Sequence, residues 1–377
     1  MKKRRLLISL TALNSIPYCL LPFIFLLLAG LPCRAQLLQP GFDKAEYLEL
    51  MKISARSTNS PAYYDTFPAP QEFQQVYKSS IMGLDNYWDL WSNGKGKAVI
   101  SIRGTTTNAV SWLANVYAAM VPAKGELQLE DDFRFSYSLA ENPRAAVHVG
   151  WLVSTAYLAR DIVPKIDSAV KSGTSDFIIV GHSQGGAIAY LLTSYLYGLQ
   201  RQSAIPSTIR FKTYCSAAPK PGNLYYAYDY EAMTFGGWAF NVVNAADWVP
   251  ESPISIQTLQ DFNNTNPFAD KKALVKKQKF PNNLVLKHVY NQLNNPSRRA
   301  GRRYQKYLGK MASKFVKKQI PGYQPPAYIN SNNYVRTGHM IALAADADYY
   351  TRFPDSKENI FAHHLHNAYM YLAAKLP

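Results

Sequence analysis

The residue whose surroundings best indicate chemistry is a serine between glycines. Residues 181–185 read GHSQG, which fits the pattern G-x-S-x-G. An apolar run, FIIV, ends at Val180, and a helical pattern of small residues follows. In a tight strand-to-helix turn the glycines prevent clashes, and the hydroxyl of Ser183 projects at a helix N-terminus, where negative charge is favoured. The pattern predicts Ser183 as a nucleophile and the N–H of Gln184 as an oxyanion donor, against the alternative of an ordinary glycine-rich turn.

A serine nucleophile needs a base, and the base needs an acid that orients it. In enzymes built around such a turn, the acid and then the histidine come later in the chain. The strand-like run FNVVN, residues 240–244, is followed by Asp247, so Asp247 is the predicted acid. A turn-forming aspartate is the alternative. Four other acids fit less well, because they lack a clear preceding strand or come too late: Asp229, Asp261, Asp346 and Asp348.

The histidine is chosen from a group near the C-terminus, in NIFAHHLHNAYMYL. This group precedes a predicted helix, where a loop can bring a ring to the serine. His364 is the first choice, His366 the second and His363 the third. His288 and His339 also follow Asp247, but His288 lies in a basic stretch that we expect to be exposed, and a zinc site in the cluster lacks matching carboxylate or cysteine spacing.

The elements that must position these residues follow an alternating order. Short apolar runs predict strands at 98–102, 177–180, 211–215 and 240–244, and helical periodicity predicts helices at 149–170 and 185–199. Residues 36–60 read as a helical lead-in. This order predicts an α/β fold, with a mostly parallel central sheet flanked by helices.

Composition excludes several classes of protein. The 377 residues are 47% apolar and only 18% charged, which excludes a disordered chain, and three cysteines exclude a disulfide scaffold. One long uncharged apolar stretch follows MKKRR and ends near the small-residue site at Ala35. It predicts a signal peptide over residues 1–35 and export, to the periplasm or outside the cell, with an uncleaved anchor as the alternative. Residues 36–377 are then one domain.

The positive charge is concentrated in one segment. The chain carries a formal net charge of +16, and residues 270–318 hold fifteen Lys and Arg against one acid, Asp270. From Arg298 onward, apolar and aromatic residues recur at helical spacing: Tyr304, Tyr307, Leu308, Met311, Phe315 and Val316. This predicts a basic amphipathic helix inserted before the C-terminal histidines. Contact with an anionic membrane or polyanion and a merely solvated surface hairpin both remain open, and nucleic acid is not expected.

Several motifs in the same order resemble the class 3 (fungal-type) lipase family of α/β hydrolases. They are IRGT at 102–105 followed by Trp112, VHVGW at 147–151, GHSQGG at 181–186, SAAP at 216–219 followed by GN at 222–223, and VVNAADWVP at 242–250. Gln184 stands where leucine is more usual in the family. The stretch between Asp247 and His364 is longer than the family usually has.

The resemblance implies Ser183, Asp247 and a histidine before a C-terminal aromatic as the catalytic triad. It implies Thr105 as the second oxyanion donor and residues 107–120 as a lid, although an ordinary core helix would give a similar pattern. The expected function is ester hydrolysis by a triacylglycerol lipase or carboxylesterase acting on lipid at an interface, without cofactor or metal. The alternatives are a phospholipase A1, a short-chain esterase, or a non-catalytic protein that binds surfaces through its basic segment.

Overall fold

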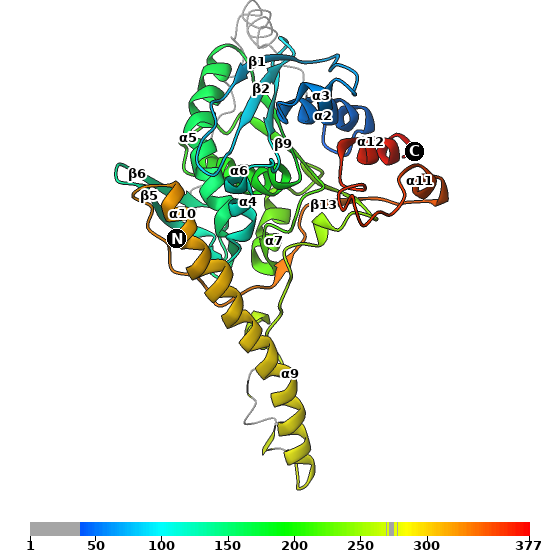
Figure 1. The fold of residues 1–377 in the computed structure, drawn as a ribbon. Helices are drawn as coiled ribbons and strands as arrows, with labels where there is room; N and C mark the ends of the chain where they lie inside the picture. The colour runs from blue at the N-terminus through cyan, green and yellow to red at the C-terminus, as the bar shows by residue number, and fades with distance from the viewer. Residues whose placement is uncertain (1–37, 269, 271–274, 277) are drawn as a thin grey trace, which may run out of the picture. The chain divides into compact units, whose positions relative to one another are not determined.

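A seven-stranded sheet is the centre of the computed structural model, which describes residues 38–268, 270, 275–276 and 278–377 (Figure 1). In spatial order its strands are β1 (Gln74–Lys78), β2 (Trp88–Ser92), β3 (Lys97–Ile102), β8 (Asp176–His182), β9 (Arg210–Ser216), β11 (Ala239–Asn244) and β13 (His339–Leu343). From β3 to β13 all neighbours are parallel, whereas β1 and β2 pair antiparallel at one edge. The predicted α/β class with a mostly parallel sheet is therefore confirmed.

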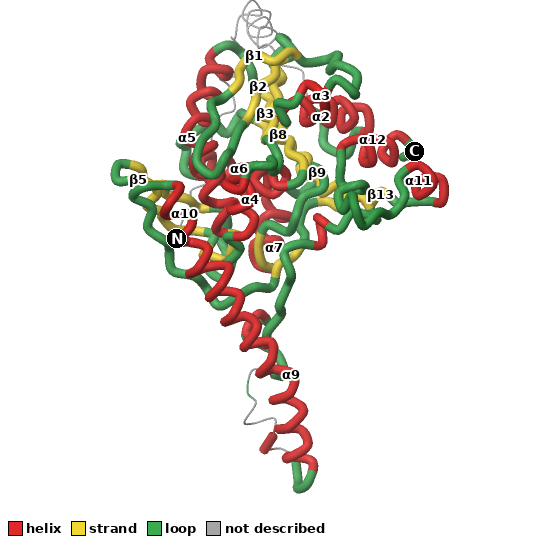
Figure 2. Tube along the Cα trace, in the orientation of Figure 1, coloured by secondary structure: helices red, strands yellow, loops and turns green. Residues whose placement is uncertain are grey.

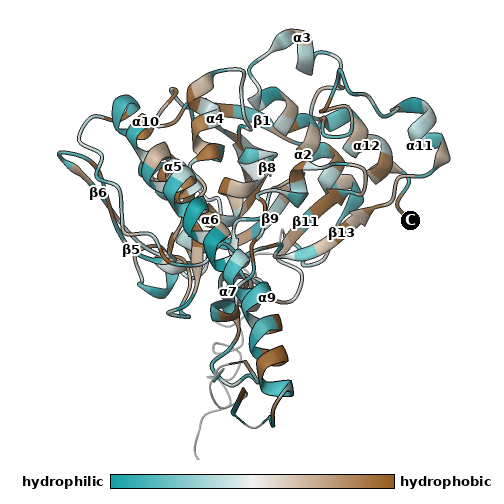
Figure 3. Ribbon diagram, turned by 60° about the horizontal axis from the view of Figure 1, so that its bottom comes forward, coloured by the Kyte–Doolittle hydropathy of each residue, from teal (hydrophilic) through white to brown (hydrophobic). Residues whose placement is uncertain are grey.

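Helices cover both faces of this sheet, because side chains alternate between the faces along each strand. Ile100 and Ile179 pack into the core that includes α5 (Val149–Lys171) and α6 (Gln184–Arg201). Their neighbours Val99 and Ile178 pack into the opposite core, with α2 (Lys44–Ser57) and α12 (His366–Ala374). Figure 3 shows these two helical layers on either side of the strands. The runs predicted as strands are mostly apolar because they are buried on both faces.

Smaller elements surround the sheet (Figure 2). A four-stranded antiparallel sheet consists of β12 (Tyr334–Val335), β10 (Gly222–Asn223), β7 (Ala146–His148) and β4 (Met120–Pro122), and a hairpin joins β5 (Lys124–Glu130) to β6 (Phe133–Ser138). The remaining helices outside the basic segment are α3 (Pro61–Tyr64), α4 (Ala109–Val116), α7 (Leu224–Met233), η1 (Val249–Glu251), η2 (Leu259–Asp261) and α11 (Ala347–Arg352). The sequence did not predict β1, β2, the hairpin or β13.

Residues 282–319, which include most of the basic segment, form one helical run. It comprises α9 (Asn282–Gln305), the π-helical turn η3 (Lys306–Met311) and α10 (Ala312–Gln319). The predicted helix is present but begins well before Arg298. Two members of its predicted apolar stripe, Tyr304 and Val316, are buried, so the second half of the run packs on the rest of the protein.

Residues 38–377 form one compact unit. The predicted signal peptide, residues 1–35, lies outside the described residues, as do parts of the basic segment at 271–274 and 277. Within the described ranges, no helix combines the length and the apolar character needed to cross a membrane.

Candidate active site

Ser183 occupies a strained turn between strand and helix. β8 ends at His182 and α6 begins at Gln184, and the serine between them has φ 61° and ψ −131°. Such a conformation is costly for a residue with a Cβ and is typical of functional positions. Both neighbours are buried, while Ser183 itself is partly exposed. The turn therefore presents the hydroxyl to the surface at the N-terminus of α6.

The glycines of the turn are required by backbone contacts. A Cβ at Gly181 would lie 2.2 Å from the carbonyl carbon of Gly185. A Cβ at Gly185 would lie 2.2 Å from the carbonyl oxygen of Ile102, at the end of β3. No side chain fits at either position, which is the physical reason for the spacing seen in the sequence.

The loop after β3 lies beside the serine. A Cβ at Gly104 would be 3.4 Å from that of Ser183. Thr105 follows, and its Oγ1 accepts a hydrogen bond of 2.9 Å from Nδ2 of Asn115 on α4. The Oδ1 atom of the same asparagine accepts a 2.8 Å bond from Nε2 of Gln184. Asn115 thus links the two residues predicted to bind an oxyanion.

Asp85 anchors the same loop through Arg103 and Thr106. Arg103 donates from one guanidinium nitrogen to the carbonyl oxygen of Asp85 at 2.8 Å and lies 3.5 Å from its carboxylate. Thr106 Oγ1 donates to that carboxylate at 2.6 Å. Both Arg103 and Asp85 are buried, so the ion pair is shielded from water and fixes the loop.

Asp247 and His364 form a buried acid–imidazole pair. Nδ1 of His364 lies 2.7 Å from Oδ2 of Asp247, and a carboxylate oxygen only accepts, so Nδ1 carries the proton. When Nδ1 carries the only proton of the ring, Nε2 is unprotonated and can take a proton. Asp247 also accepts from the hydroxyl of Tyr369 at 2.7 Å and from the N–H of Val249 at 2.9 Å.

His364 is joined to the serine turn through its backbone. Nε2 of His182, the residue before Ser183, lies 2.6 Å from the carbonyl oxygen of His364, and the two rings are 5.0 Å apart. Among the described residues, no hydrogen bond joins the Ser183 hydroxyl to a histidine ring. In enzymes without bound substrate this bond is often long or poorly aligned.

The other predicted histidines make different contacts. His366 bonds through Nδ1 to Tyr63 and through Nε2 to Ser54, and burial lowers its pKa to about 3. His363 bonds to Tyr349 and to Asp355. Among the described residues, neither ring forms a hydrogen bond with Asp247. His288 and His339 are exposed.

Three of the other four candidate acids are engaged elsewhere, and Asp348 is exposed. Asp229 accepts from the N–H of Asn142, Asp261 caps η2, and Asp346 caps α11 and pairs with Lys375. Of the predicted residues, the structure brings together Ser183, Gln184, Thr105, Asp247 and His364. In the described part of the chain, no group of three or more His, Cys, Asp or Glu side chains is arranged to hold a metal ion.

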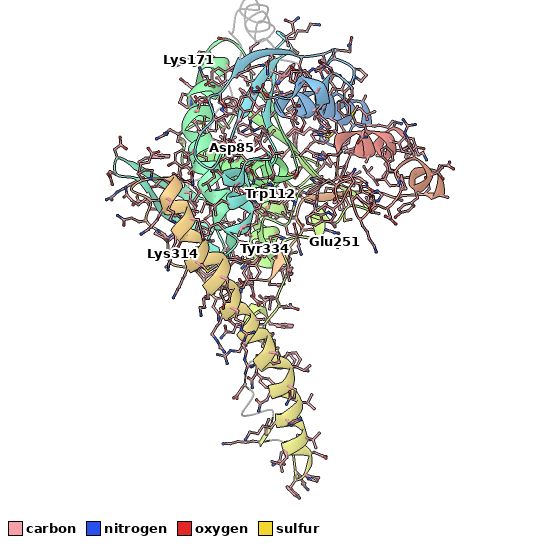
Figure 4. The ribbon with its side chains drawn as sticks, viewed as in Figure 1. Asp85, Trp112, Lys171, Glu251, Lys314 and Tyr334 are labelled. Carbon is pink, nitrogen blue, oxygen red and sulfur yellow. The ribbon has the colours of Figure 1, made fainter. Side chains whose placement is uncertain are left out.

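The segment predicted as a lid is divided in two. Residues 109–116 form α4, from which Trp112 and Val116 are exposed at 41% and 46%. Figure 4 labels Trp112. The Trp112 ring lies 6.3 Å from Phe361, which itself lies 5.8 Å from His364. Residues 117–120 are buried. An ordinary core helix would not expose two large apolar side chains.

Three residues with clear contacts at the site were not predicted. His182 is the variable residue of G-x-S-x-G, Asn115 is a polar residue within an apolar helix, and Tyr369 served only as a marker for the histidine. The one available signal was Asn115, because an amide amid apolar residues requires partners when it is buried.

Comparisons with known proteins find similarity to lipases. A model of the family described as "Lipase (class 3)" matches residues 99–256. The secreted mono- and diacylglycerol lipase 1 of Fusarium solani is 26% identical over 163 residues, which are 43% of this chain and 40% of that relative. The chain thus covers less than half the length of this relative.

Solved lipase structures are similar at low identity. The Rhizomucor miehei lipase propeptide complex is 22% identical over 57% of this chain and 65% of that chain, with a TM-score of 0.41. The Lip2 lipase from Yarrowia lipolytica is 17% identical over 58% of this chain and 77% of that chain, with a TM-score of 0.43. The resemblance to class 3 lipases predicted from the motifs is confirmed by the family match over residues 99–256, and the mostly parallel sheet agrees with the predicted α/β-hydrolase architecture.

Proposed function

We propose that the protein hydrolyses carboxylic esters of lipids through an acyl-enzyme, with Ser183, His364 and Asp247 as its triad. The observation that carries the proposal is the 2.7 Å contact between His364 and Asp247, both of which are buried. The backbone carbonyl of His364 is in turn hydrogen-bonded to His182, the residue before Ser183. A strained serine, a neutral imidazole and a carboxylate that orients it are the three components of acyl transfer.

In this mechanism, Nε2 of His364 takes the proton of Ser183 while Oγ attacks the ester carbonyl. The N–H groups of Gln184 and Thr105 bind the oxyanion, and the imidazolium then protonates the leaving alcohol. Water, activated by the same ring, attacks the acyl-enzyme and releases the carboxylic acid. Because Thr105 Oγ1 accepts from Asn115, its own hydroxyl proton remains available to the oxyanion.

Turnover of soluble p-nitrophenyl butyrate tests the proposal. Ser183→Ala should reduce kcat by on the order of 10⁵–10⁶, whereas Ser207→Ala, at an exposed serine outside the site, should match the unchanged protein. Labelling by a fluorophosphonate should occur and disappear in Ser183→Ala. An unlabelled native protein would favour the non-catalytic surface-binding alternative.

The substrate proposed is a glycerolipid ester, because the curated relative is a mono- and diacylglycerol lipase and α4 exposes apolar side chains above the site. Triacylglycerol, phospholipid sn-1 esters and short-chain esters differ in chain length and headgroup. Comparing emulsified triolein, phosphatidylcholine and p-nitrophenyl acetate separates a lipase from a phospholipase A1 and from a short-chain esterase.

Two further predictions belong with this proposal. Export after cleavage near Ala35 agrees with the secreted relative, and the N-terminal sequence of the exported protein tests it. Residues 270–318 are proposed to contact an anionic membrane or polyanion, and residues 36–377 to act as one domain. The exposed cations on α9 and α10, such as Lys314, support such a contact (Figure 4).

A further inference from the structure

The first half of α9 exposes an apolar stripe. Val285, Val289 and Leu293 are exposed at 59%, 46% and 73%. At 100° per residue they lie within about 80° of one another, on one face of the helix. In Figure 3 this part of α9 carries a hydrophobic band on an otherwise hydrophilic helix. Such an ordered set of large apolar side chains in water is unusual unless it binds something.

This stripe continues toward the end of α9 that contacts the rest of the protein. Tyr304 lies about 100° from Val285, beside the line of the exposed side chains. It is 9% exposed, and its ring lies 6.4 Å from that of Tyr334. One apolar face therefore packs on the protein at one end and is unpartnered among the described residues at the other. We call residues 282–303 the arm.

Cations border this face along one flank. Arg299 and Arg303 are exposed and one turn apart, and an open groove of about 770 Å³ runs beside them with Tyr304 and Tyr307 in its lining. Asp270 is the one acid in residues 270–318. The arm thus combines exposed apolar side chains with an almost purely positive border.

We infer that the arm binds the surface of a bilayer rich in anionic lipids, with Val285, Val289 and Leu293 inserted among the acyl chains and Arg299 and Arg303 at the headgroup phosphates. This combination is the one that interfacial helices use. A second copy of the chain would bring the same positive charges to the stripe and be repelled. A soluble polyanion would satisfy the arginines but leave the apolar side chains in water.

The bound arm would be attached close to the candidate active site. α10 packs against α4, and the carbonyl oxygen of Leu308, in η3, accepts a 3.1 Å bond from the N–H of Ala119 just after α4. A Cβ at Gly309 would lie 2.9 Å from Cβ of Ala119, so the two backbones are in close contact. The inference deepens the proposed function by naming the surface on which lipid esters are met.

Co-sedimentation with vesicles of phosphatidylcholine, with and without 30% phosphatidylglycerol, tests the inference. The full chain carrying Ser183→Ala is used, so that the lipid is not hydrolysed. We expect binding to the anionic vesicles and at least tenfold less to the neutral ones. Val285→Ser, Val289→Ser and Leu293→Ser together should lower anionic binding at least tenfold, and Arg299→Gln with Arg303→Gln should lower it about fivefold per charge, less so at high salt.

Matched controls lie outside the arm. Val76→Ser with Ile81→Ser removes apolar side chains of similar exposure, and Lys95→Gln with Lys124→Gln removes two exposed charges. Both pairs should bind vesicles like the parent. Undiminished vesicle binding by the serine triple variant would overturn the inference in favour of a purely electrostatic polyanion contact. A dimer that the same triple variant dissociates would overturn it in favour of a second copy.

The outcome for the arm is separable from that for the triad. In the chain with native Ser183, the arm variants should hydrolyse soluble p-nitrophenyl butyrate at the parental rate. If the parent binds anionic vesicles through the stripe but hydrolyses no ester, the proposed function fails and the arm remains a lipid-binding element. If hydrolysis is intact but the stripe is dispensable for binding, the inference fails alone.

Discussion

Nε2 of His182 lies 2.6 Å from the carbonyl oxygen of His364. Since a carbonyl only accepts, Nε2 carries the proton, and Nδ1 accepts from Ser216 Oγ at 3.1 Å. Ser216 Oγ in turn lies 2.8 Å from the hydroxyl of Tyr47 on α2. Burial, followed by the neighbouring histidines His366 and His364, lowers the pKa of His182 well below its usual value, so this chain of hydrogen bonds stays neutral and fixed.

We predict that His182 positions the loop that carries His364. Glutamine places its amide nitrogen where Nε2 lies, whereas asparagine places it where Nδ1 lies. His182→Gln should therefore keep kcat for a soluble ester within about tenfold, and His182→Asn should lower it about 100-fold with little change in KM. Equal losses in the two variants, or a loss confined to KM, would contradict this role.

Tyr369 should support the carboxylate of Asp247. Its hydroxyl donates at 2.7 Å to the same Oδ2 that His364 contacts, and burial raises the pKa of Tyr369 well above its usual value, so it remains a donor. A hydrogen bond to a charged group contributes about 1.5–3 kcal/mol. Tyr369→Phe should thus lower kcat roughly 10- to 100-fold.

The control for this prediction is Tyr350→Phe, at an exposed tyrosine. Its kcat should equal that of the parent. Thermal unfolding of both variants separates a misoriented Asp247 from a destabilised fold. A parental kcat in Tyr369→Phe would contradict the prediction and show that His364 and Val249 hold Asp247 sufficiently.

The local parts of the site were predictable because they depend on short-range sterics. The glycines around Ser183 are imposed by contacts with residues close in the turn and with the end of β3, and Asp247 follows a strand whose apolar run is plain in the sequence. The strands buried on both faces were found for the same reason. Edge strands β1 and β2, with polar residues such as those in QQVYK, carry no comparable signal.

The long-range parts were not predictable. Three histidines within four residues have similar sequence surroundings, and only the path of the loop decides that His364 faces Asp247 while His366 faces Tyr63 and Ser54. Likewise, the apolar stripe assigned from Arg298 onward is partly buried. Its members Tyr304 and Val316 pack on the rest of the protein, whereas Tyr307, Met311 and Phe315 stay exposed, and further exposed apolar side chains lie upstream of Arg298.

Acidification should destabilise the fold through buried histidines. His148 is fully buried and stacked on Trp151 at 3.7 Å, and burial lowers its pKa to about 3. The unfolded residue titrates near about 6.5, so between these values the unfolded chain binds a proton that the folded chain lacks. The contribution of His148 to the free energy of unfolding is fully present above the unfolded pKa. It decreases as the pH is lowered between the two pKa values, by about 2 kcal/mol from pH 7 to pH 5.

His148→Asn isolates this contribution, because its Oδ1 can still cap α5 by accepting from the N–H of Trp151. The free energy of unfolding, from denaturant titration at pH 7, 6 and 5, should fall less steeply with acid in the variant. The difference in the free energy of unfolding between the parent and the variant should decrease by about 2 kcal/mol from pH 7 to pH 5. Parallel curves for the two proteins would show that His148 does not titrate as its burial requires.

Gln184 should hold α4 over the site. Its side chain is 2% exposed, and Nε2 donates to the carbonyl oxygen of Ser111 at 2.9 Å and to Oδ1 of Asn115 at 2.8 Å. Gln184→Leu keeps the backbone N–H but leaves the Ser111 carbonyl without this donor. We expect faster hydrogen exchange in residues 109–116 and unchanged exchange in α6, with kcat on soluble esters falling no more than about tenfold.

Asn115→Asp provides the complementary change. The carboxylate can still accept from Gln184 and from the indole N–H of Trp151, but it cannot donate to Thr105. This variant should keep slow exchange in α4 and lose kcat about 10- to 100-fold, because the Thr105 hydroxyl then turns its proton toward the introduced carboxylate and away from the oxyanion. If both variants altered exchange and kcat in the same proportion, α4 and the oxyanion donors would be a single unit, and Gln184 and Asn115 would not have separable roles.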